Sequence, residues 1–277
     1  MDEYLDWTIN LLDDAVVSAL DEQSLWSARF GLLLLEHVPL RGDATVLDVG
    51  CGTGFPLFEL AHMLGPAAQL VGVDIWQAAL DRAAHKRAVY GLDNVALVAI
   101  NGVTLPFAEA HFDLIVANLL LNNVERPLAL LAECARVAKP AARLALTTNL
   151  EGHMQEFYAV FRQVLTDLGL TTYLERLAAH EQHRGTKDSV CHMVEAAGFQ
   201  VVKIAEDACR LRYASGSAFF RHFLSKVGFL PGWRSVVDSS DARTVFAALE
   251  AALNAEAAAT GQLAMTVPML YLEATRS

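Results

Sequence analysis

Residues 46–56 read VLDVGCGTGFP, an apolar stretch followed by three alternating glycines and a proline. The apolar part predicts a buried β-strand, and Pro56 favours the start of a helix. Gly50, Gly52 and Gly54 permit positive φ angles and let a ligand approach the backbone closely, while the next helix offers unpaired amides. The segment therefore predicts a strand, a glycine loop and a helix that bind a nucleotide-like cofactor. A glycine-rich turn that only connects strand to helix is the alternative.

The glycine spacing does not fit the dinucleotide-binding pattern G-x-G-x-x-G. Counted from Gly50, the position of the third glycine holds Phe55. Counted from Gly52, it holds Leu57. Asp48 inside the predicted strand would repel a pyrophosphate and suits a ligand with an ammonium group. These residues favour a cationic cofactor, and a nicotinamide-dependent oxidoreductase is a disfavoured alternative.

Two later segments supply side chains suited to the rest of such a cofactor. Asp74 ends the stretch VGVDI about 20 residues after the last glycine, where an acid can accept hydrogen bonds from ribose hydroxyls. Capping of the next helix is the alternative role for this residue. Asn101 follows the next predicted strand, where its amide can bind an adenine edge, and Asn118 closes the strand after that.

Short apolar runs alternate with helical patterns along most of the chain, which is typical of βα units around a parallel sheet. Strands are predicted at 45–49, 70–73, 95–100, 112–117, 143–148 and 198–204, with a last one after Pro268. Crossover helices are predicted at 56–64, 77–90 and 127–138. Two segments, 151–198 and 214–260, have helical periodicity and are too long for plain crossovers. Further helices are predicted at 8–20, 27–37 and 241–259.

Composition and charge limit the classes of function. The chain has 277 residues, of which 54% are hydrophobic and 19% charged, so it can bury a core and is not disordered. Thirty-two acidic against 21 basic residues give a net charge of −11, which disfavours nucleic acid and anionic lipid surfaces as partners. No window approaches the roughly 18 uncharged residues of a membrane span, and the acidic amino terminus does not resemble a signal peptide. We therefore expect a soluble, cytoplasmic monomer or homodimer without membrane insertion.

Three segments in order along the chain carry a family resemblance. VLDVGCGTG, VGVDI and NGVTLPFAEAHFDLIVAN, followed by RVAKP, resemble successive motifs of class I S-adenosylmethionine-dependent methyltransferases, especially the small-molecule group called methyltransferase type 11 or UbiE-like. The resemblance covers about residues 40–150 and implies an α/β, Rossmann-like fold. Its sheet would have seven mostly parallel strands with the last one antiparallel. The single methyltransferase domain, 1–277, would comprise a helical cap (1–40), a cofactor-binding core (41–150), helical lid insertions (151–198 and 214–260) and a final strand (261–277).

The resemblance also implies roles for individual residues towards S-adenosylmethionine. The loop residues Gly50, Cys51 and Gly52 would pass under its methionine part, with Asp48 near its amino group. Asp74 would bind the ribose. The other expected contacts are Gly54 in the loop, Ile75 and Trp76 beside adenine, Asn101 and Gly102 at its edge, Asn118 at the methionyl end, and Trp26 and Arg29 from the amino-terminal helices.

Some of these positions depart from the family pattern or have another explanation. Asn101 stands where the family usually has Asp, which keeps an acceptor oxygen and removes a charge. RVAKPAAR departs from the usual KPGG turn. Arg29 could pair with the cofactor carboxylate. An aromatic staple that holds the two amino-terminal helices is an equally good explanation for the aromatic residues around Trp26.

The acceptor and the catalytic groups are less well defined by the residues. Methyl transfer from a sulfonium is an in-line displacement that depends on positioning and on exclusion of water. A carboxylate acceptor needs little more, whereas a phenol or carbon acid favours a His or carboxylate base, for which His153 and His183 are candidates. The lid aromatics favour a hydrophobic or amphipathic small-molecule acceptor, such as a quinone-, lipid- or polyketide-like compound: Phe219, Phe220, Phe223, Phe229 and Trp233.

The histidines and cysteines bear on a metal site, and the glycine loop leaves one alternative function open. His180 and His183 are three residues apart without an apparent third ligand, and the four cysteines lie scattered, so we expect no metal site and reduced thiols. The intact glycine loop does not by itself establish turnover. A catalytically silent module that binds the cofactor is therefore the alternative function.

Overall fold

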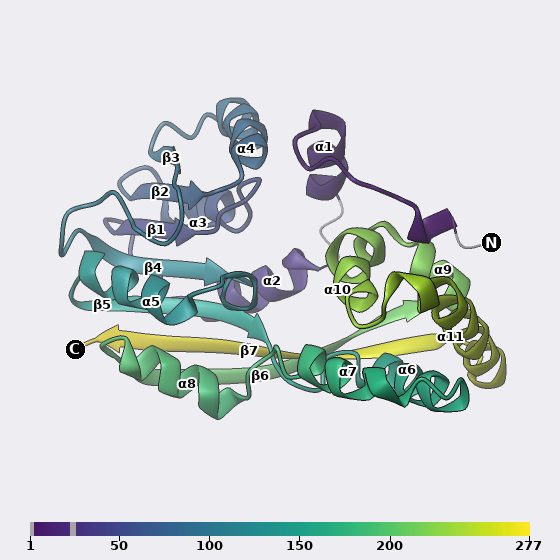
Figure 1. Ribbon diagram of the computed structural model, residues 1–277. Coiled ribbons are helices and arrows are strands. Elements are labelled where there is room, and N and C mark those ends of the chain that lie inside the picture. Colours follow the sequence, from purple (N-terminus) through teal and green to yellow (C-terminus); the bar gives the residue numbers. More distant parts are fainter. Residues whose placement is uncertain (1–2, 23–25) are drawn as a thin grey trace. The chain divides into compact units, whose positions relative to one another are not determined.

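The structure is a computed structural model that describes residues 3–22 and 26–277 (Figure 1). Seven strands form one sheet in the order β3-β2-β1-β4-β5-β7-β6. Strands β1 to β5 pair in parallel, and β7 pairs antiparallel with β5. This confirms the predicted Rossmann-like sheet with an antiparallel last strand. The strands are β1 Thr45–Val49, β2 Gln69–Asp74, β3 Val95–Ala99, β4 Phe112–Asn118, β5 Ala138–Asn149, β6 Phe199–Tyr213 and β7 Leu263–Arg276.

Helices fill the connections and both long insertions, as the periodicity predicts. In the part of the chain that carries the glycine loop they are α1 Asp14–Glu22, α2 Ser27–His37, α3 Leu57–Leu64, α4 Gln77–Tyr90 and α5 Pro127–Val137. Those that follow β5 are α6 Gln155–Asp167, α7 Leu174–Glu181, α8 Lys187–Ala196, α9 Gly216–Arg221, α10 Leu230–Arg234 and α11 Ser239–Thr260. Short 3₁₀ or π turns lie at Glu3–Leu5, Leu121–Asn123, Thr171–Tyr173 and Ser225–Phe229.

The first helix starts later than its amphipathic pattern predicts, at Asp14 instead of residue 8. The side chain of Asn10 accepts a hydrogen bond from the Leu12 amide at 3.0 Å, and that of Asp13 accepts one from the Ala15 amide at 2.8 Å. The Asn10 side chain thereby closes a turn ahead of the helix. Asp13 caps the helix, because its side chain binds the second helical amide and its carbonyl accepts the first helical hydrogen bond, from the Val17 amide at 3.0 Å. The helix therefore begins directly after Asp13.

The last strand contradicts the expectation that it begins after Pro268. β7 starts at Leu263 and passes through the proline. Its ladder with β5 ends at the pair Asn149 and Met269, so Pro268 lies one residue beyond it. A missing amide removes no bond to β5 there, and the proline carbonyl accepts a hydrogen bond from the Leu150 amide at 3.2 Å.

The chain divides into two compact units. The first, here called the sheet unit, comprises residues 10–149, 186–207 and 269–277. The second, here called the helical unit, comprises residues 150–185 and 208–268 together with the amino-terminal residues up to Ile9. The expected division into cap, core, lids and final strand stays a prediction.

The sheet unit has the core expected of parallel strands covered on both faces. In β1 all residues after Thr45 are buried, including the charged Asp48. Helix α2 packs on β4 and β5, α3 on β2, and α4 on β2 and β3. Burial on both faces explains why these strands read as continuous apolar runs. It also makes the polar residues at the strand ends conspicuous.

An aromatic core fills the helical unit. Phe157 on α6 lies at the centre of this core, with its ring centroid 4.3 Å from that of Trp233 and 5.5 Å from that of Phe219. Other fully buried rings are Phe161, Phe220 and Phe246. Such pairs add attraction beyond the burial of their area. Most of the aromatic residues predicted to belong to the lids are therefore core residues.

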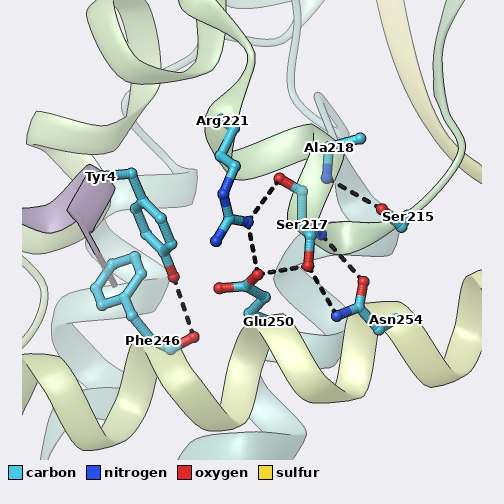
Figure 2. A network of polar contacts seen from close by, with 8 residues as sticks. All are labelled: Tyr4, Ser215, Ser217, Ala218, Arg221, Phe246, Glu250 and Asn254. Carbon is cyan, nitrogen blue, oxygen red and sulfur yellow. Dashed lines mark hydrogen bonds and ion pairs between the residues drawn. The ribbon is translucent and has the colours of Figure 1, made fainter. Parts of the chain in front are cut away.

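A polar clamp joins α9 to α11 within this unit (Figure 2). On α11, Glu250 accepts hydrogen bonds from the Ser217 hydroxyl at 2.5 Å and from Arg221 at 2.8 Å. Asn254 accepts from the Ser217 amide and donates to its hydroxyl, both at 3.0 Å. Tyr4 donates to the Phe246 carbonyl at 3.4 Å, which ties the amino-terminal residues to the same helix.

The clamp predicts a pH-dependent contribution to stability. Burial alone would raise the pKa of Glu250, but hydrogen bonds from Arg221 and Ser217 outweigh it and lower the pKa below its ordinary value. A carboxyl with a lowered folded-state pKa stabilises the fold above its unfolded pKa, and this is lost as the pH falls through the folded value. We expect Glu250→Gln to lower the free energy of unfolding by about 1–2 kcal/mol at pH 7.

Urea unfolding at pH 7 and at lower pH measures this effect. The difference between Glu250→Gln and wild type should persist down to the ordinary glutamate pKa, near 4.3, and shrink as the pH falls below it. Glu256→Gln, on the same helix, is the matched control and should unfold like wild type. Equal unfolding midpoints for the two variants at pH 7 would contradict the clamp's contribution.

Candidate cofactor and active site

The glycine loop after β1 has the backbone that its sequence requires. Gly50, Gly52 and Gly54 have φ angles of 77°, 52° and 102°, in the left-handed region. A β-carbon at Gly50 would lie 2.8 Å from a methyl carbon of Leu120. At Gly52 a β-carbon would meet none of the described atoms within 4 Å. The loop is therefore packed at its start and open above Gly52, where a ligand can approach the backbone.

Strand β2 holds this loop in place. The amides of Gly50 and Cys51 both donate to the Val73 carbonyl, at 2.8 and 3.1 Å. The Gly52 amide donates to Oδ2 of Asp74 at 2.8 Å. Three successive amides are thus bound by the last two residues of β2, and the loop is fixed before any ligand arrives.

The predicted adenine and ribose residues follow neighbouring strand ends. Oδ1 of Asp74 accepts a hydrogen bond from the Trp76 amide at 2.9 Å, and each carboxylate oxygen retains acceptor capacity for a ribose hydroxyl. Asp74 pairs with Ala99 in the β2–β3 register, so Asn101 comes shortly after the neighbouring strand. The side chain of Ile75 is 70% exposed. Asn101 and Gly102 are also exposed, so this edge of the sheet is available to a ligand.

Asp48 is a buried acid beneath the loop. It has no measurable exposure, and neither carboxyl oxygen has a hydrogen-bond partner among the described residues. Burial, and then the charge of Asp74, raise the pKa of Asp48 to about 8, an effect that the Leu57 amide opposes only in part. The group is therefore largely neutral at pH 7 without ligand. It fits a ligand with an ammonium group, which would favour the ionised form.

Asn118 is already engaged by the protein at the end of β4. Its side-chain carbonyl accepts from the Thr147 hydroxyl at 2.7 Å, and its amide donates to the Ser27 carbonyl at 3.2 Å. Since Ser27 begins α2, Asn118 positions the helix that carries Arg29. Arg29 is exposed and forms no ion pair with any described residue. Trp26, next to the helix start, is partly exposed.

Helix α1 reaches the loop through a residue that sequence reasoning missed. Asp21 accepts hydrogen bonds from the Thr53 hydroxyl at 2.8 Å, from Arg82 at 2.9 Å and from Lys86 at 2.6 Å. These partners lie 32 to 65 positions away, so no local pattern around Asp21 could have indicated them. Helix α1 is thereby anchored to both the glycine loop and α4.

The two histidines predicted as candidate bases both belong to the helical unit. His153 precedes α6 and is buried, with 3% exposure, whereas His183 follows α7 and is exposed. Burial, then the charges of Arg184 and His180, lower the pKa of His153 far below its ordinary value, so it is neutral at pH 7. Their roles in catalysis stay predictions.

Other chemistries find little support in the part of the chain that the structure describes. No group of three or more His, Cys, Asp or Glu side chains there is arranged to hold a metal ion. None of its helices is both long and apolar enough to cross a bilayer. No disulfide is present among the described residues, and burial raises the pKa of the Cys51 thiol, which therefore stays protonated within the loop.

Comparison with known proteins bears on this site. A family model described as a methyltransferase domain matches residues 40–198. The chain belongs to this methyltransferase family. A demethylmenaquinone methyltransferase of Anoxybacillus flavithermus is 32% identical over 179 residues, covering 61% of this chain and 76% of the relative. One from Listeria welshimeri is 31% identical over 193 residues, covering 66% and 79%.

Solved structures share the fold of this methyltransferase. A putative methyltransferase from Bacillus halodurans superposes with a TM-score of 0.58 at 17% identity, covering 88% of this chain and 97% of that one. A SAM-dependent methyltransferase from Aquifex aeolicus gives 0.53 at 23% identity, covering 70% and 92%. The family match confirms the resemblance to class I S-adenosylmethionine-dependent methyltransferases and with it the predicted methyl donor. The same match argues against the alternative of a nicotinamide-dependent oxidoreductase.

The position of Asp74 predicts the effect of removing its carboxylate. Asp74→Ala would lose both the ribose acceptors and the anchor of the Gly52 amide. Hydrogen bonds to charged groups contribute about 1.5–3 kcal/mol each, so we expect affinity for S-adenosylhomocysteine to fall by about 10- to 100-fold. Isothermal titration calorimetry measures this. Asp81→Ala, on the exposed face of α4, should bind like wild type, and a similar loss in both variants would contradict the role of Asp74.

Asp48 predicts a dependence of stability on pH in the protein without ligand. Because its folded-state pKa is raised, its stabilising effect is complete below the unfolded pKa, near 3.9, and is lost as the pH rises through about 8. One proton contributes a slope of up to about 1.4 kcal/mol per pH unit in this window. We expect Asp48→Asn to remove the slope in urea unfolding measured from pH 4 to 9. Asp93→Asn, at an exposed position, should keep it; an unchanged slope in Asp48→Asn would contradict the prediction.

Proposed function

We propose that this methyltransferase transfers the methyl group of S-adenosylmethionine to an oxygen or carbon atom of a small, apolar or amphipathic acceptor. The observation that carries the proposal is the fixed, open glycine loop with an acid at the end of the neighbouring strand. Asp74, whose Oδ2 accepts the Gly52 amide at 2.8 Å, retains acceptor capacity for ribose hydroxyls beside the open backbone of that glycine. The S-adenosylmethionine sulfonium supplies an electrophilic methyl group when bound.

The residues around the loop suit the other parts of that cofactor. The open backbone at Gly52 admits the methionine part, and Asp48 favours its ammonium group. Arg29, which is exposed and has no acidic partner among the described residues, is suited to its carboxylate. Ile75 and Trp76 offer apolar surfaces for adenine. Together these residues bind and orient the donor, which is the main requirement of an in-line displacement.

Two independent features support the acceptor class. The helical unit, which contains the predicted lids, has an aromatic core that includes Phe157, Phe229 and Trp233. The relatives named above are demethylmenaquinone methyltransferases, so their acceptor is a quinone-type compound. On both grounds we infer a ring compound of quinone type as the acceptor of this chain. This inference holds for methylation of either an oxygen or a carbon atom of that ring.

Methyl transfer to an extract tests the proposal. Purified protein is incubated with methyl-labelled S-adenosylmethionine and a lipid extract of the host, and label is counted in the organic phase. We expect wild type and the Asp81→Ala control to transfer label, and Asp74→Ala to lose at least about 90% of it, in keeping with the expected loss of affinity. Tight S-adenosylhomocysteine binding without any transfer would instead support the catalytically silent alternative.

A further inference from the structure

Four polar side chains meet inside the otherwise aromatic helical unit. They are His153 before α6, Tyr158 on α6, His180 at the end of α7 and Arg184 three residues after α7; we call them the Arg184 cluster. Tyr158 is buried, its hydroxyl accepts a hydrogen bond from Trp233 Nε1 at 3.3 Å, and its ring centroid lies 5.9 Å from that of His180. The guanidinium of Arg184 hydrogen-bonds the Tyr158 side chain, and its charge also acts on His153 and His180. The cluster is therefore compact.

Arg184 supplies the positive charge of this cluster. A guanidinium remains protonated at every pH that proteins meet. Burial, then Arg184 and His183, lower the pKa of His180 to about 4. His153, as described above, is neutral at pH 7 for similar reasons. Burial raises the pKa of Tyr158, which keeps its phenol protonated as well.

Among the described residues, no acid balances this cation, since no carboxylate of theirs lies within 4.0 Å of the Arg184 guanidinium. The nearest acid in sequence, Glu181, pairs with Arg162 at 2.8 Å. Nη1 of Arg184 is buried without a hydrogen-bond acceptor, although the residue as a whole is partly exposed. Nη1 is thus withdrawn from water, while part of the residue reaches the surface.

Such an arrangement destabilises the protein unless a ligand completes it. A buried charge without a partner loses hydration that only an opposite charge or hydrogen-bond acceptors replace. The chain does not lack acids, since it has 32 against 21 basic residues. The absence of one at this position therefore indicates that an anion from outside provides the missing charge.

The surroundings of the cluster define the shape of that anion. The Phe229 ring lies 5.5 Å from His153, and it stacks on Trp233 at 5.6 Å with an interplanar angle of 27°. Flat aromatic surfaces prefer a planar, apolar ligand. A charge-assisted hydrogen bond to a guanidinium requires an oxyanion. Both requirements are met by an aromatic ring that bears an acidic oxygen.

We propose that Arg184 binds the anionic oxygen of an aromatic ligand whose ring lies beside Phe229. If this ligand is the methyl acceptor, a step that rests on the proposed function, the acceptor binds already deprotonated. Its electron pair then forms the new bond to the methyl carbon while the carbon–sulfur bond breaks and its electrons remain on sulfur. No protein base is needed to generate that electron pair.

Calorimetry with a charged and a neutral probe of the same shape tests the anion site. Wild type is titrated at pH 7.5, in the presence of S-adenosylhomocysteine, with 2-naphthoate and with 2-naphthamide. We expect naphthoate to bind at least about tenfold more tightly, as a charge-assisted hydrogen bond requires. Arg184→Gln should reduce this preference to within about twofold. Arg176→Gln, on α7 and paired with the exposed Asp238, is the matched control and should retain it.

Thermal unfolding of the same variants distinguishes a ligand-binding arginine from a structural one. Without ligand, Arg184→Gln removes an unbalanced cation, so its melting temperature should rise by about 2–4 °C, whereas Arg176→Gln should change little. A marked fall in the melting temperature of Arg184→Gln would overturn the proposal. Equal affinity of wild type for the two probes would overturn it as well, even if the variant does not fold.

Failure of this proposal is distinguishable from failure of the proposed function. If wild type binds S-adenosylhomocysteine but shows no preference for naphthoate, the anion site is rejected and methyl transfer stands. If wild type does not bind S-adenosylhomocysteine, the proposed function fails. In that case the titration is repeated without S-adenosylhomocysteine, and the probe preference and the melting temperatures still test the role of Arg184.

Discussion

The hydrogen bond from the Gly52 amide to the Asp74 carboxylate is the constraint on which the cofactor site depends. It ties the loop after β1 to the end of β2, and the Val73 carbonyl secures the two preceding amides. Only glycine tolerates the resulting backbone at Gly50, where φ is positive and Leu120 lies close. The rigid loop then leaves one open stretch, above Gly52, beside an acid that still has acceptor capacity. Cofactor recognition thus follows from packing that is complete before the cofactor binds.

The polar centres of the two units have opposite character. In the sheet unit, the acids Asp48 and Asp74 lie beneath and beside the glycine loop, which suits a donor that carries a sulfonium and an ammonium group. In the helical unit, Arg184 is a cation without a balancing acid among the described residues, which suits an anionic acceptor. Transfer of a methyl cation equivalent to an anion neutralises both reactants. The charges of this chain are therefore arranged for the reactants it is proposed to bind.

Elements that are determined by local sequence agree with the predictions made from it. The strand, loop and helix around residues 46–56 follow from apolar runs, glycine conformations and a proline, and the order of the motifs identified the family. Sequence reasoning failed where a distant contact decides, since β7 passes through Pro268 because its pairing with β5 ends one residue later. It also placed the start of α1 too early, because the amphipathic pattern did not reveal the Asn10 turn and the Asp13 cap. Asp21 and Arg184 were missed or passed over because their significance lies in partners, or in a missing partner, that only the fold reveals.

A crystal structure of the protein with bound S-adenosylhomocysteine tests the central claim most directly. The account predicts that both ribose hydroxyls donate to the Asp74 carboxylate while the Gly52 amide keeps its bond to the same group, with the homocysteine part above the open glycine. A ligand whose ribose lies away from Asp74, or a loop that has to open and abandon the Gly52 bond to admit it, would contradict the account.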